Sequence, residues 1–264
     1  MPSLVQDIGI SLLAAGTLGV IFTRLKIPSI AAFLLAGVIV GPIGLKLVTD
    51  PVNIDTIAQL GFILLLILIV LLLRAFLVEP FRIPSGSMMP TLLEGDFIFV
   101  KKYSYGLRLP VTETKIIETG EPQRGDVVVF RLPSDPSVNY IKRVVGLPGD
   151  TVVYDRHRLT INGQPVELRR SDDKTWGAPV YVEDLDGRLH DILVMTPEFS
   201  TRDNTYRVPE GHYWVMGDNR DRSKDSRFIG PIPEKFLVGE AVRIWMHFVP
   251  WNMPDWPRIG MKIQ

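Results

Sequence analysis

A serine in a short glycine-containing segment and a lysine set among apolar residues are the side chains best suited to covalent chemistry. Ser87 lies in the run IPSGSMMPT (residues 83–91), and Lys142 lies in YIKRVVG (residues 140–146). A serine hydroxyl is a weak nucleophile until a neighbouring base removes its proton. A lysine can be that base when burial lowers its pKa towards neutrality. A long apolar run ends a few residues before Ser87, so the pattern suggests a serine hydrolase at a membrane surface.

Composition excludes several other classes of function. Lys plus Arg and Asp plus Glu both number 29, so the formal net charge is zero and no basic footprint of a nucleic-acid binder is present. Cysteine is absent, which excludes disulfides, thiolate metal sites and a cysteine nucleophile. The histidines are scattered, without metal-ligand spacing, at positions 157, 190, 212 and 247. The sequence therefore predicts no metal and no cofactor.

Apolar stretches dominate the first third of the chain. They cover Ile8–Phe22, Ile27–Leu45 and Leu60–Val78. A helix needs roughly 20 apolar residues to cross the hydrocarbon core, so the third stretch is a convincing span. The first is short, and Gly41-Pro42 interrupts the second. The start of the chain lacks the basic region of a cleavable signal peptide, so we expect a permanent anchor of two or three transmembrane helices.

Positive charges leave the topology of this anchor open. Arg24 and Lys26 favour a cytoplasmic loop after the first stretch, and Lys46 adds weaker support for a cytoplasmic loop before the third. Both loops cannot be cytoplasmic if all three stretches span. Either the second stretch is re-entrant or interfacial, or all three span and Arg24 and Lys26 lie outside. Both arrangements place the Ser87 domain on the outer face.

Short β-branched and aromatic runs separated by turn signals fill the rest of the chain. They predict strands over residues 96–100, 126–130, 140–145, 151–154 and 237–248, and a hairpin that turns at Asn162-Gly163. We therefore expect a membrane anchor region at residues 1–78 and a mainly antiparallel β catalytic domain at 79–264. Residues from about 169 to 208 mix charges, proline and glycine and are interpreted as an inserted subregion.

Taken singly, Ser87 would be an ordinary turn serine and Lys142 a surface lysine whose stem covers apolar neighbours. Four blocks in order change that interpretation, because together they resemble type I signal peptidases, also called leader peptidases. The blocks are EPFRIPSGSMMPTL (79–92, followed by Glu94-Gly95-Asp96), RGDVVVF (124–130), YIKRVVGLPGD (140–150) and MGDNRDRSKDSR (216–227). The chain carries lysine at the base position, as in the bacterial serine–lysine form.

The resemblance implies roles for individual residues. Ser87 would be the nucleophile and Lys142 the general base, with the Ser87 backbone N–H and the Ser85 hydroxyl as oxyanion donors. Ser223 would orient Lys142, and Asp225 and Arg227 would support the site through a charged network. Asp218 and Arg143 would contribute structurally.

Such an enzyme would act on signal-peptide-bearing preproteins at the lipid bilayer. The substrate would add as an extended strand beside residues 82–84 and 140–141. Small residues at the first and third positions before the cut, the A-x-A pattern, would suit shallow apolar pockets. Candidate wall residues are Phe81, Ile83, Tyr140 and Ile141, each of which could equally belong to the core.

Part of the anchor resembles another family. Residues 23–66 are similar to the first transmembrane elements of potassium/proton antiporters, particularly LKIPS (25–29), LLAG (34–37) and GPIGL (41–45). Ion transport usually needs ionisable groups within the membrane, and no Asp or Glu lies within the three apolar cores. We therefore expect a borrowed anchor without transport activity.

The sequence thus predicts a multi-pass serine endopeptidase of the bacterial cytoplasmic membrane, with its catalytic domain on the extracytoplasmic face, that cleaves signal peptides from exported preproteins. One alternative is a catalytically inactive peptidase-like subunit of a membrane transport or regulatory protein. Another is a self-cleaving protease that uses the same serine–lysine chemistry.

Overall fold

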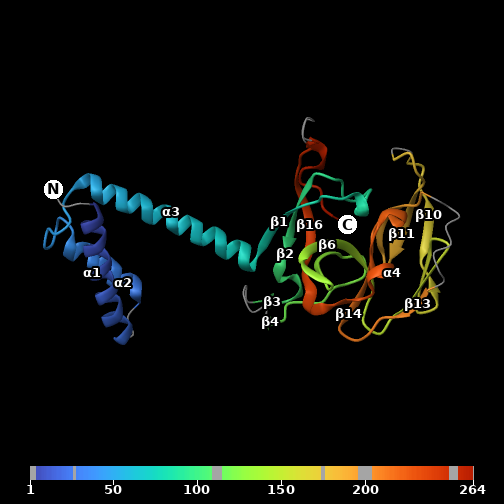
Figure 1. The fold of residues 1–264 in the computed structure, drawn as a ribbon, viewed down its shortest axis with the longest axis horizontal. Coiled ribbons are helices and arrows are strands. Elements are labelled where there is room, and N and C mark those ends of the chain that lie inside the picture. The colour runs from blue at the N-terminus through green and yellow to red at the C-terminus, as the bar shows by residue number, and fades with distance from the viewer. Residues whose placement is uncertain are drawn as a thin grey trace. The chain divides into compact units, whose positions relative to one another are not determined.

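The computed structural model describes residues 4–25, 28–108, 115–173, 176–195, 204–249 and 255–263. It divides into two compact units, Met1–Leu71 and Leu72–Gln264 (Figure 1). This division falls within the last helix of the first third, a little before the domain boundary that the sequence predicts after residue 78.

Three helices form the first unit: α1 (Leu4–Arg24), α2 (Ser29–Val40) and the beginning of α3 (Pro51–Phe76). Among the described residues, α1 and α3 are long and apolar enough to cross a membrane. The second apolar stretch gives only the 12-residue helix α2, which ends at Gly41 because Pro42 has no N–H with which to continue it. Lys26, one of the charges used for topology, lies outside the described residues.

Helix α3 begins well before its apolar stretch. Asp50 accepts a hydrogen bond from the Val52 N–H at 2.9 Å, and Pro51 occupies the first helical position, where its missing N–H costs nothing. None of its most apolar 18-residue window is buried by protein. A helix that is apolar all round and uncovered requires a lipid environment, so this unit associates with a membrane.

A carboxylate lies just outside the first predicted apolar stretch. Asp7 in α1 is fully buried, and its Oδ2 accepts a hydrogen bond from Asn53 Nδ2 of α3 at 2.7 Å. The pair ties the start of α1 to the start of α3.

The second unit is built on a seven-stranded antiparallel sheet with the order β1-β2-β16-β5-β6-β14-β15. Its strands are β1 (Val78–Arg82), β2 (Asp96–Lys101), β5 (Val127–Leu132), β6 (Asp135–Gly146), β14 (His212–Met216), β15 (Ile232–Pro233) and β16 (Leu237–His247). Bulges in β16 and β14 bend the sheet. The mainly antiparallel β architecture is confirmed.

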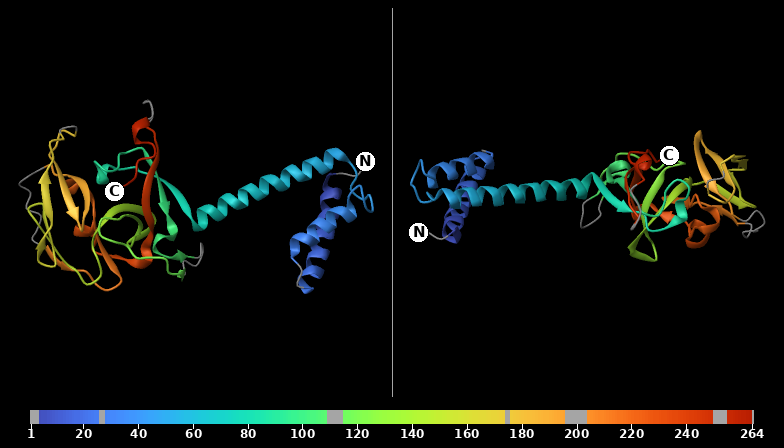
Figure 2. Two further views of the ribbon diagram at one scale, coloured as in Figure 1. Left: turned by 180° about the vertical axis from the view of Figure 1, so that it is seen from behind. Right: turned by 90° about the horizontal axis from the view of Figure 1, so that it is seen from above.

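Smaller sheets extend the domain. One has the order β13-β7-β8-β9 and another β10-β11-β12, while β3 pairs with β4. Both views of Figure 2 show β10–β12 at the end of this unit opposite to β1, β2 and β16. The strands are β3 (Leu107–Arg108), β4 (Lys115–Ile117), β7 (Thr151–Asp155), β8 (Arg158–Ile161), β9 (Gln164–Pro165), β10 (Glu167–Arg170), β11 (Val180–Leu185), β12 (Arg188–Leu193) and β13 (Asn204–Arg207).

The hairpin predicted at Asn162-Gly163 joins β8 to β9. Both turn residues have positive φ, 52° and 77°, as a two-residue hairpin turn of this sequence requires. The predicted inserted subregion contains the β11–β12 hairpin, which we call the insert hairpin (residues 180–193). Residues 174–175 and 196–203 of that subregion lie outside the described part of the chain.

Short helical turns complete the domain and position much of the polar chemistry. Ser87 lies in one of them, and Arg220 in another. The turns are η1 (Gly86–Met88), η2 (Lys102–Tyr105), η3 (Arg220–Arg222), α4 (Ser226–Ile229), η4 (Glu234–Phe236) and η5 (Trp256–Arg258). The apolar core lies in three clusters on the faces of the sheets, which hold β6 and η1 in place.

Candidate active site

Ser87 and Lys142 meet although 55 positions separate them in the chain. Ser87 lies in turn η1 after β1, and Lys142 lies near the end of β6, where it pairs with Val128 of β5. Lys142 Nζ donates a hydrogen bond to Ser87 Oγ at 2.7 Å. It donates a second, also at 2.7 Å, to the Ile141 carbonyl. The two predicted reactive groups are therefore in direct contact.

Burial prepares Lys142 to act as a base. The residue is 4% exposed, and desolvation lowers the pKa of its amine to about 8. The Asp225 and Asp218 carboxylates oppose this shift but do not outweigh it. A substantial fraction of Lys142 is thus neutral near pH 8, and the amine can accept a proton from the Ser87 hydroxyl.

The segment around Ser87 is fastened to the loop that follows β14. The backbone N–H of Asn219 donates to the Ser87 carbonyl at 3.1 Å, and Asn219 Nδ2 donates to the Gly86 carbonyl at 3.0 Å. Gly217 lets this loop approach, because a Cβ on it would lie 2.5 Å from the Ser87 carbonyl oxygen and 2.2 Å from Ser223 Oγ. Any side chain at Gly217 would push the loop away from Ser87.

Ser85 is exposed on the open side of Ser87. The two hydroxyl oxygens are 3.4 Å apart, at the outer limit of a hydrogen bond. The Ser85 hydroxyl can therefore rotate towards a group bound at Ser87. This geometry fits the role of an oxyanion donor.

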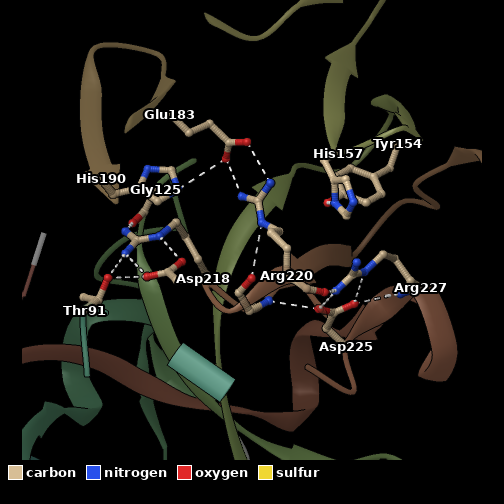
Figure 3. Close-up of polar contacts among 12 residues, drawn as sticks. Thr91, Gly125, Tyr154, His157, Glu183, His190, Asp218, Arg220, Asp225 and Arg227 are labelled. Carbon is tan, nitrogen blue, oxygen red and sulfur yellow. Dashed lines mark hydrogen bonds and ion pairs between the residues drawn. The ribbon is translucent and has the colours of Figure 1, made fainter. Parts of the chain in front are cut away.

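Asp225 and Arg227 form a compact ion pair beside this loop (Figure 3). Both carboxylate oxygens of Asp225 accept from the Arg227 guanidinium at 2.8 Å, and one also accepts from the Gly217 N–H at 3.0 Å. Burial alone would raise the pKa of Asp225, but the Arg227 hydrogen bonds hold it below its usual range. The pair stabilises the loop that supports Ser87.

Ser223 is buried between these groups. Its hydroxyl makes no hydrogen bond of normal geometry to a described residue, and Lys142 Nζ donates instead to Ser87 and Ile141. The predicted orienting contact from Ser223 to Lys142 is therefore not formed in this structure. The residue nevertheless lies against Gly217, close to the nucleophile.

Arg143 points away from Lys142, as neighbours on a strand do, and pairs with Asp218. Its Nε and Nη2 donate to the two Asp218 oxygens at 2.8 and 2.6 Å, and Nη1 donates to the Gly125 carbonyl at 2.8 Å (Figure 3). Thr91 donates to the same carboxylate. The pair therefore joins β6, the segment after Ser87 and the loop after β14.

Sequence comparison assigns the chain to a family. The family model described as "Signal peptidase, peptidase S26" matches residues 56–246. Signal peptidase I of Pseudomonas fluorescens is 50% identical over 211 residues, which cover 73% of this chain and 74% of that protein. Signal peptidase I of Haemophilus influenzae is 35% identical over 241 residues, covering 72% and 69%. The chain belongs to the type I signal peptidase family. It is a protease, in the hydrolase class.

Two further matches concern parts of the chain. A family model described as "Sodium/hydrogen exchanger, transmembrane" matches residues 9–74. The crystal structure of a signal peptidase I from Enterococcus faecalis V583 aligns with 46% of this chain and 96% of its own, at 29% identity and a TM-score of 0.30.

The candidate wall residues of this signal peptidase domain lie in different environments. Ile83 and Ile141 are buried in one core cluster, and Phe81 is half-buried against it. Tyr140 is half-buried, and its ring centroid lies 5.5 Å from Lys142 Nζ. Phe81 and Tyr140 are therefore the two whose side chains remain partly open to a substrate.

Sequence reasoning missed residues of the insert hairpin that support the signal peptidase site. Glu183 of β11 accepts two hydrogen bonds from Arg220, at 2.8 and 2.5 Å, and all three residues of the cluster with His190 are buried (Figure 3). Arg220 lies in the last of the four sequence blocks. The residues around Glu183 and His190 in the sequence do not predict that these two side chains contact Arg220. Asn219 lies in the same block as Arg220, and its residue type alone predicts no role for it.

Proposed function

We propose that the chain is a membrane-bound serine endopeptidase that removes N-terminal signal peptides from exported preproteins, with Ser87 as nucleophile and Lys142 as general base. The observation that carries this proposal is the 2.7 Å hydrogen bond from a buried lysine of lowered pKa to a serine hydroxyl. Membership of the signal peptidase family supports the substrate class.

In this mechanism neutral Lys142 removes the proton of Ser87 as the serine oxygen attacks the scissile carbonyl carbon. The C–N bond then breaks, and the Lys142 ammonium gives its proton to the departing amine. An ester between Ser87 and the signal peptide remains. A water molecule, deprotonated by Lys142, attacks the ester, and Ser87 regains its proton as the signal peptide leaves.

Negative charge develops on the carbonyl oxygen in both steps. The Ser87 backbone N–H and the Ser85 hydroxyl are the proposed donors to it. Asp225 and Arg227 act at a distance, by holding the loop that carries Gly217 against Ser87. Ser223 packs against Gly217 in that loop.

Substrate binding by strand addition is supported by free edges next to the dyad. Strand β1 is an edge strand of the large sheet. Among the described residues, strand β6 pairs with β14 only over residues 143–146, so residues 135–142 have no strand partner on that side. The Ile141 carbonyl accepts from Lys142 Nζ there. An extended signal-peptide C-region placed there would lie beside Ser87.

We propose further that the enzyme is a multi-pass protein of the bacterial cytoplasmic membrane with its catalytic domain on the extracytoplasmic face. Two helices of spanning length and the short helix α2 favour the arrangement in which α2 does not cross. This arrangement puts the loop with Arg24 and Lys46 inside and the catalytic domain outside.

The deciding experiment is cleavage of a preprotein with an A-x-A site by the detergent-solubilised full chain. We expect a single cut after the small-residue site by the parent. Ser87→Ala and Lys142→Ala should abolish it, since one removes the nucleophile and the other the base. Circular dichroism establishes that both variants fold.

Cleavage that persists in either folded variant contradicts the dyad. A folded parent that makes no cut contradicts the proposed substrate and favours an inactive peptidase-like subunit. Cleavage of the chain itself, in the absence of preprotein, would favour the self-processing alternative.

A further inference from the structure

The peptide group between Gly86 and Ser87 carries the N–H to which the mechanism assigns half of the oxyanion hole. Ser87 is the second residue of the single turn η1, so no carbonyl of that turn is available to accept its N–H. Among the described residues the Ser87 N–H donates to no other carbonyl either, so it can serve a substrate. Within the turn, the Met89 N–H donates to the Gly86 carbonyl at 3.2 Å, which is long for a hydrogen bond and constrains the peptide group only weakly.

Asn219 holds the other end of the same peptide group. Its Nδ2 donates to the Gly86 carbonyl oxygen at 3.0 Å. A trans peptide group is planar, and its C=O and N–H point in opposite directions. Fixing the Gly86 carbonyl therefore fixes the Ser87 N–H. The Asn219 backbone N–H holds the next carbonyl, that of Ser87, at 3.1 Å.

The Asn219 side chain is itself buried, with 2% exposure, and the loop that carries it is braced by the insert hairpin. Leu193 N–H donates to the Asp218 carbonyl at 2.9 Å, directly before Asn219. Arg220, directly after it, is clamped by Glu183. Asn219 therefore cannot follow the Gly86 carbonyl if that carbonyl turns.

We propose that Asn219 is a positioning residue for catalysis, which aims the Ser87 N–H at the developing oxyanion by locking the Gly86–Ser87 peptide plane from a loop braced by the insert hairpin. This inference rests on the proposed function, because it assigns a partner to the oxyanion donor of that mechanism. Asn219 does not touch the substrate. It stabilises the transition state, in which the carbonyl oxygen of the substrate carries negative charge.

The test compares Asn219→Ala with the parent full chain at pH 9, where Lys142 is largely neutral, on a peptide with an A-x-A site. Three readings are taken: the steady-state kinetics, which give kcat and KM; the inhibition constant of the matching peptide aldehyde; and the dissociation constant of the matching peptide alcohol. The aldehyde adds Ser87 Oγ to its carbonyl carbon and so places an oxygen in the hole. The alcohol binds without that bond.

We expect kcat/KM to fall about 10- to 100-fold, mostly through kcat, since a misaimed donor costs somewhat less than a deleted one. Aldehyde binding should weaken by a similar factor, while alcohol binding changes less than about threefold. Thr91→Val is the matched control. It loosens the same loop through Asp218 without touching Gly86, and should leave the ratio of the two binding constants at the parent value.

A folded Asn219→Ala enzyme with parental kcat/KM and aldehyde binding overturns the inference. So does a slower enzyme whose aldehyde binding is unchanged. If Asn219→Ala unfolds, Asn219→Asp keeps the shape while replacing the donor by an oxygen, and the same three readings decide. A parent that neither cuts the peptide nor binds the aldehyde contradicts the proposed function itself, which separates the two failures.

Discussion

The buried amine of Lys142 should make both the rate of cleavage and the stability of the fold depend on pH. Its pKa is lowered to about 8 by desolvation. The base must be neutral to accept the Ser87 proton, so kcat/KM should rise with pH through a pKa near 8 and level off above it. Peptide hydrolysis between pH 6 and 10 measures this profile. An activity that is already constant from pH 6 would contradict Lys142 as the base.

The same burial costs stability at neutral pH. Because the folded-state pKa lies below the unfolded value of 10.5, the unfolded chain binds the proton more tightly. The resulting loss in the free energy of unfolding is greatest below pH 8 and disappears as pH rises towards 10.5.

The substitution Lys142→Met removes the charge and keeps the side-chain volume. We expect it to be inactive yet more stable at pH 7 by roughly 1–3 kcal/mol, with the gain shrinking towards pH 10 in urea unfolding experiments.

Ser85→Ala tests the second oxyanion donor. Loss of one such donor should lower kcat by roughly two to three orders of magnitude. The side chain is exposed, so stability should be unchanged. Ser137→Ala is a suitable control, because it removes another exposed hydroxyl, on β6, that donates to Asp135. Parental kcat in folded Ser85→Ala would leave the Ser87 N–H to act alone.

At this scale the sequence predicted the Ser87–Lys142 contact and the Asp225–Arg227 pair, but not the parts of Asn219 and Gly217. Ser87 and Lys142 lie in segments with distinctive composition, and their approach follows from the resemblance. Asn219 and Gly217 act through backbone proximity, which residue type alone does not reveal. The hydrogen bond predicted from Ser223 to Lys142 depends on ångström-scale placement, and here the lysine donates to a carbonyl of its own strand instead.

Among the elements, the insert hairpin acts as a brace for the loop after β14. Its Glu183 is fully buried, and although burial would raise the pKa of that carboxyl, the Arg220 and His190 partners hold it well below its usual range. A depressed carboxyl pKa contributes stability above the unfolded value, and this contribution is lost as pH falls. The brace should therefore weaken only in strong acid.

Glu183→Gln leaves the Arg220 charge buried without its counter-charge. We expect a loss of roughly 3–5 kcal/mol in the free energy of unfolding, measured by urea titration at pH 7. The double variant Glu183→Leu with Arg220→Met should recover much of this loss, since it leaves no unpaired buried charge. Equal destabilisation by the single and double variants would show that the ion pair is not the source.

Element prediction from the sequence succeeded where local patterns decide the structure and failed where packing does. Alternating residues and the Asn162-Gly163 turn indicated the strands and hairpin that form. The start of α3 was missed because residues 51–59 are not apolar enough to extend the apolar stretch, although Asp50-Pro51 is a helix-start signal. The partners of the insert hairpin are set by long-range contacts.

For the whole molecule, the point where the anchor can be removed is set by hydrogen bonds rather than by the end of the apolar run. The Leu77 carbonyl accepts from the Lys102 N–H at 3.0 Å, and β1 pairs with β2 over Val78–Arg82. A chain of residues 77–264 should fold with an unfolding free energy within about 1 kcal/mol of the catalytic unit in the parent. A chain of residues 83–264 loses β1 and should unfold readily.

The chain of residues 77–264 also shows whether the anchor contributes to peptide hydrolysis itself or only brings the enzyme to a membrane-embedded substrate. We expect residues 77–264 to cleave a soluble peptide with a kcat close to the parent value. Cleavage of a preprotein embedded in liposomes should slow markedly, because enzyme and substrate no longer share a surface. Equal rates of the two proteins on the embedded preprotein would contradict a role for the anchor in bringing them together.

The adjacency of Lys142 and Arg143 on β6 has a consequence for the newly made chain. A one-residue slip of a strand exchanges its two faces. On β6 it would bring either Arg143 or Ile141, depending on the direction of the slip, into the place of Lys142 beside Ser87. A guanidinium does not give up its proton in proteins and isoleucine has no titratable group, so the slipped form has no base. Molecules in which β6 has closed out of register would therefore be inactive, and the chain would gain proteolytic activity only when its own sheet has closed in register.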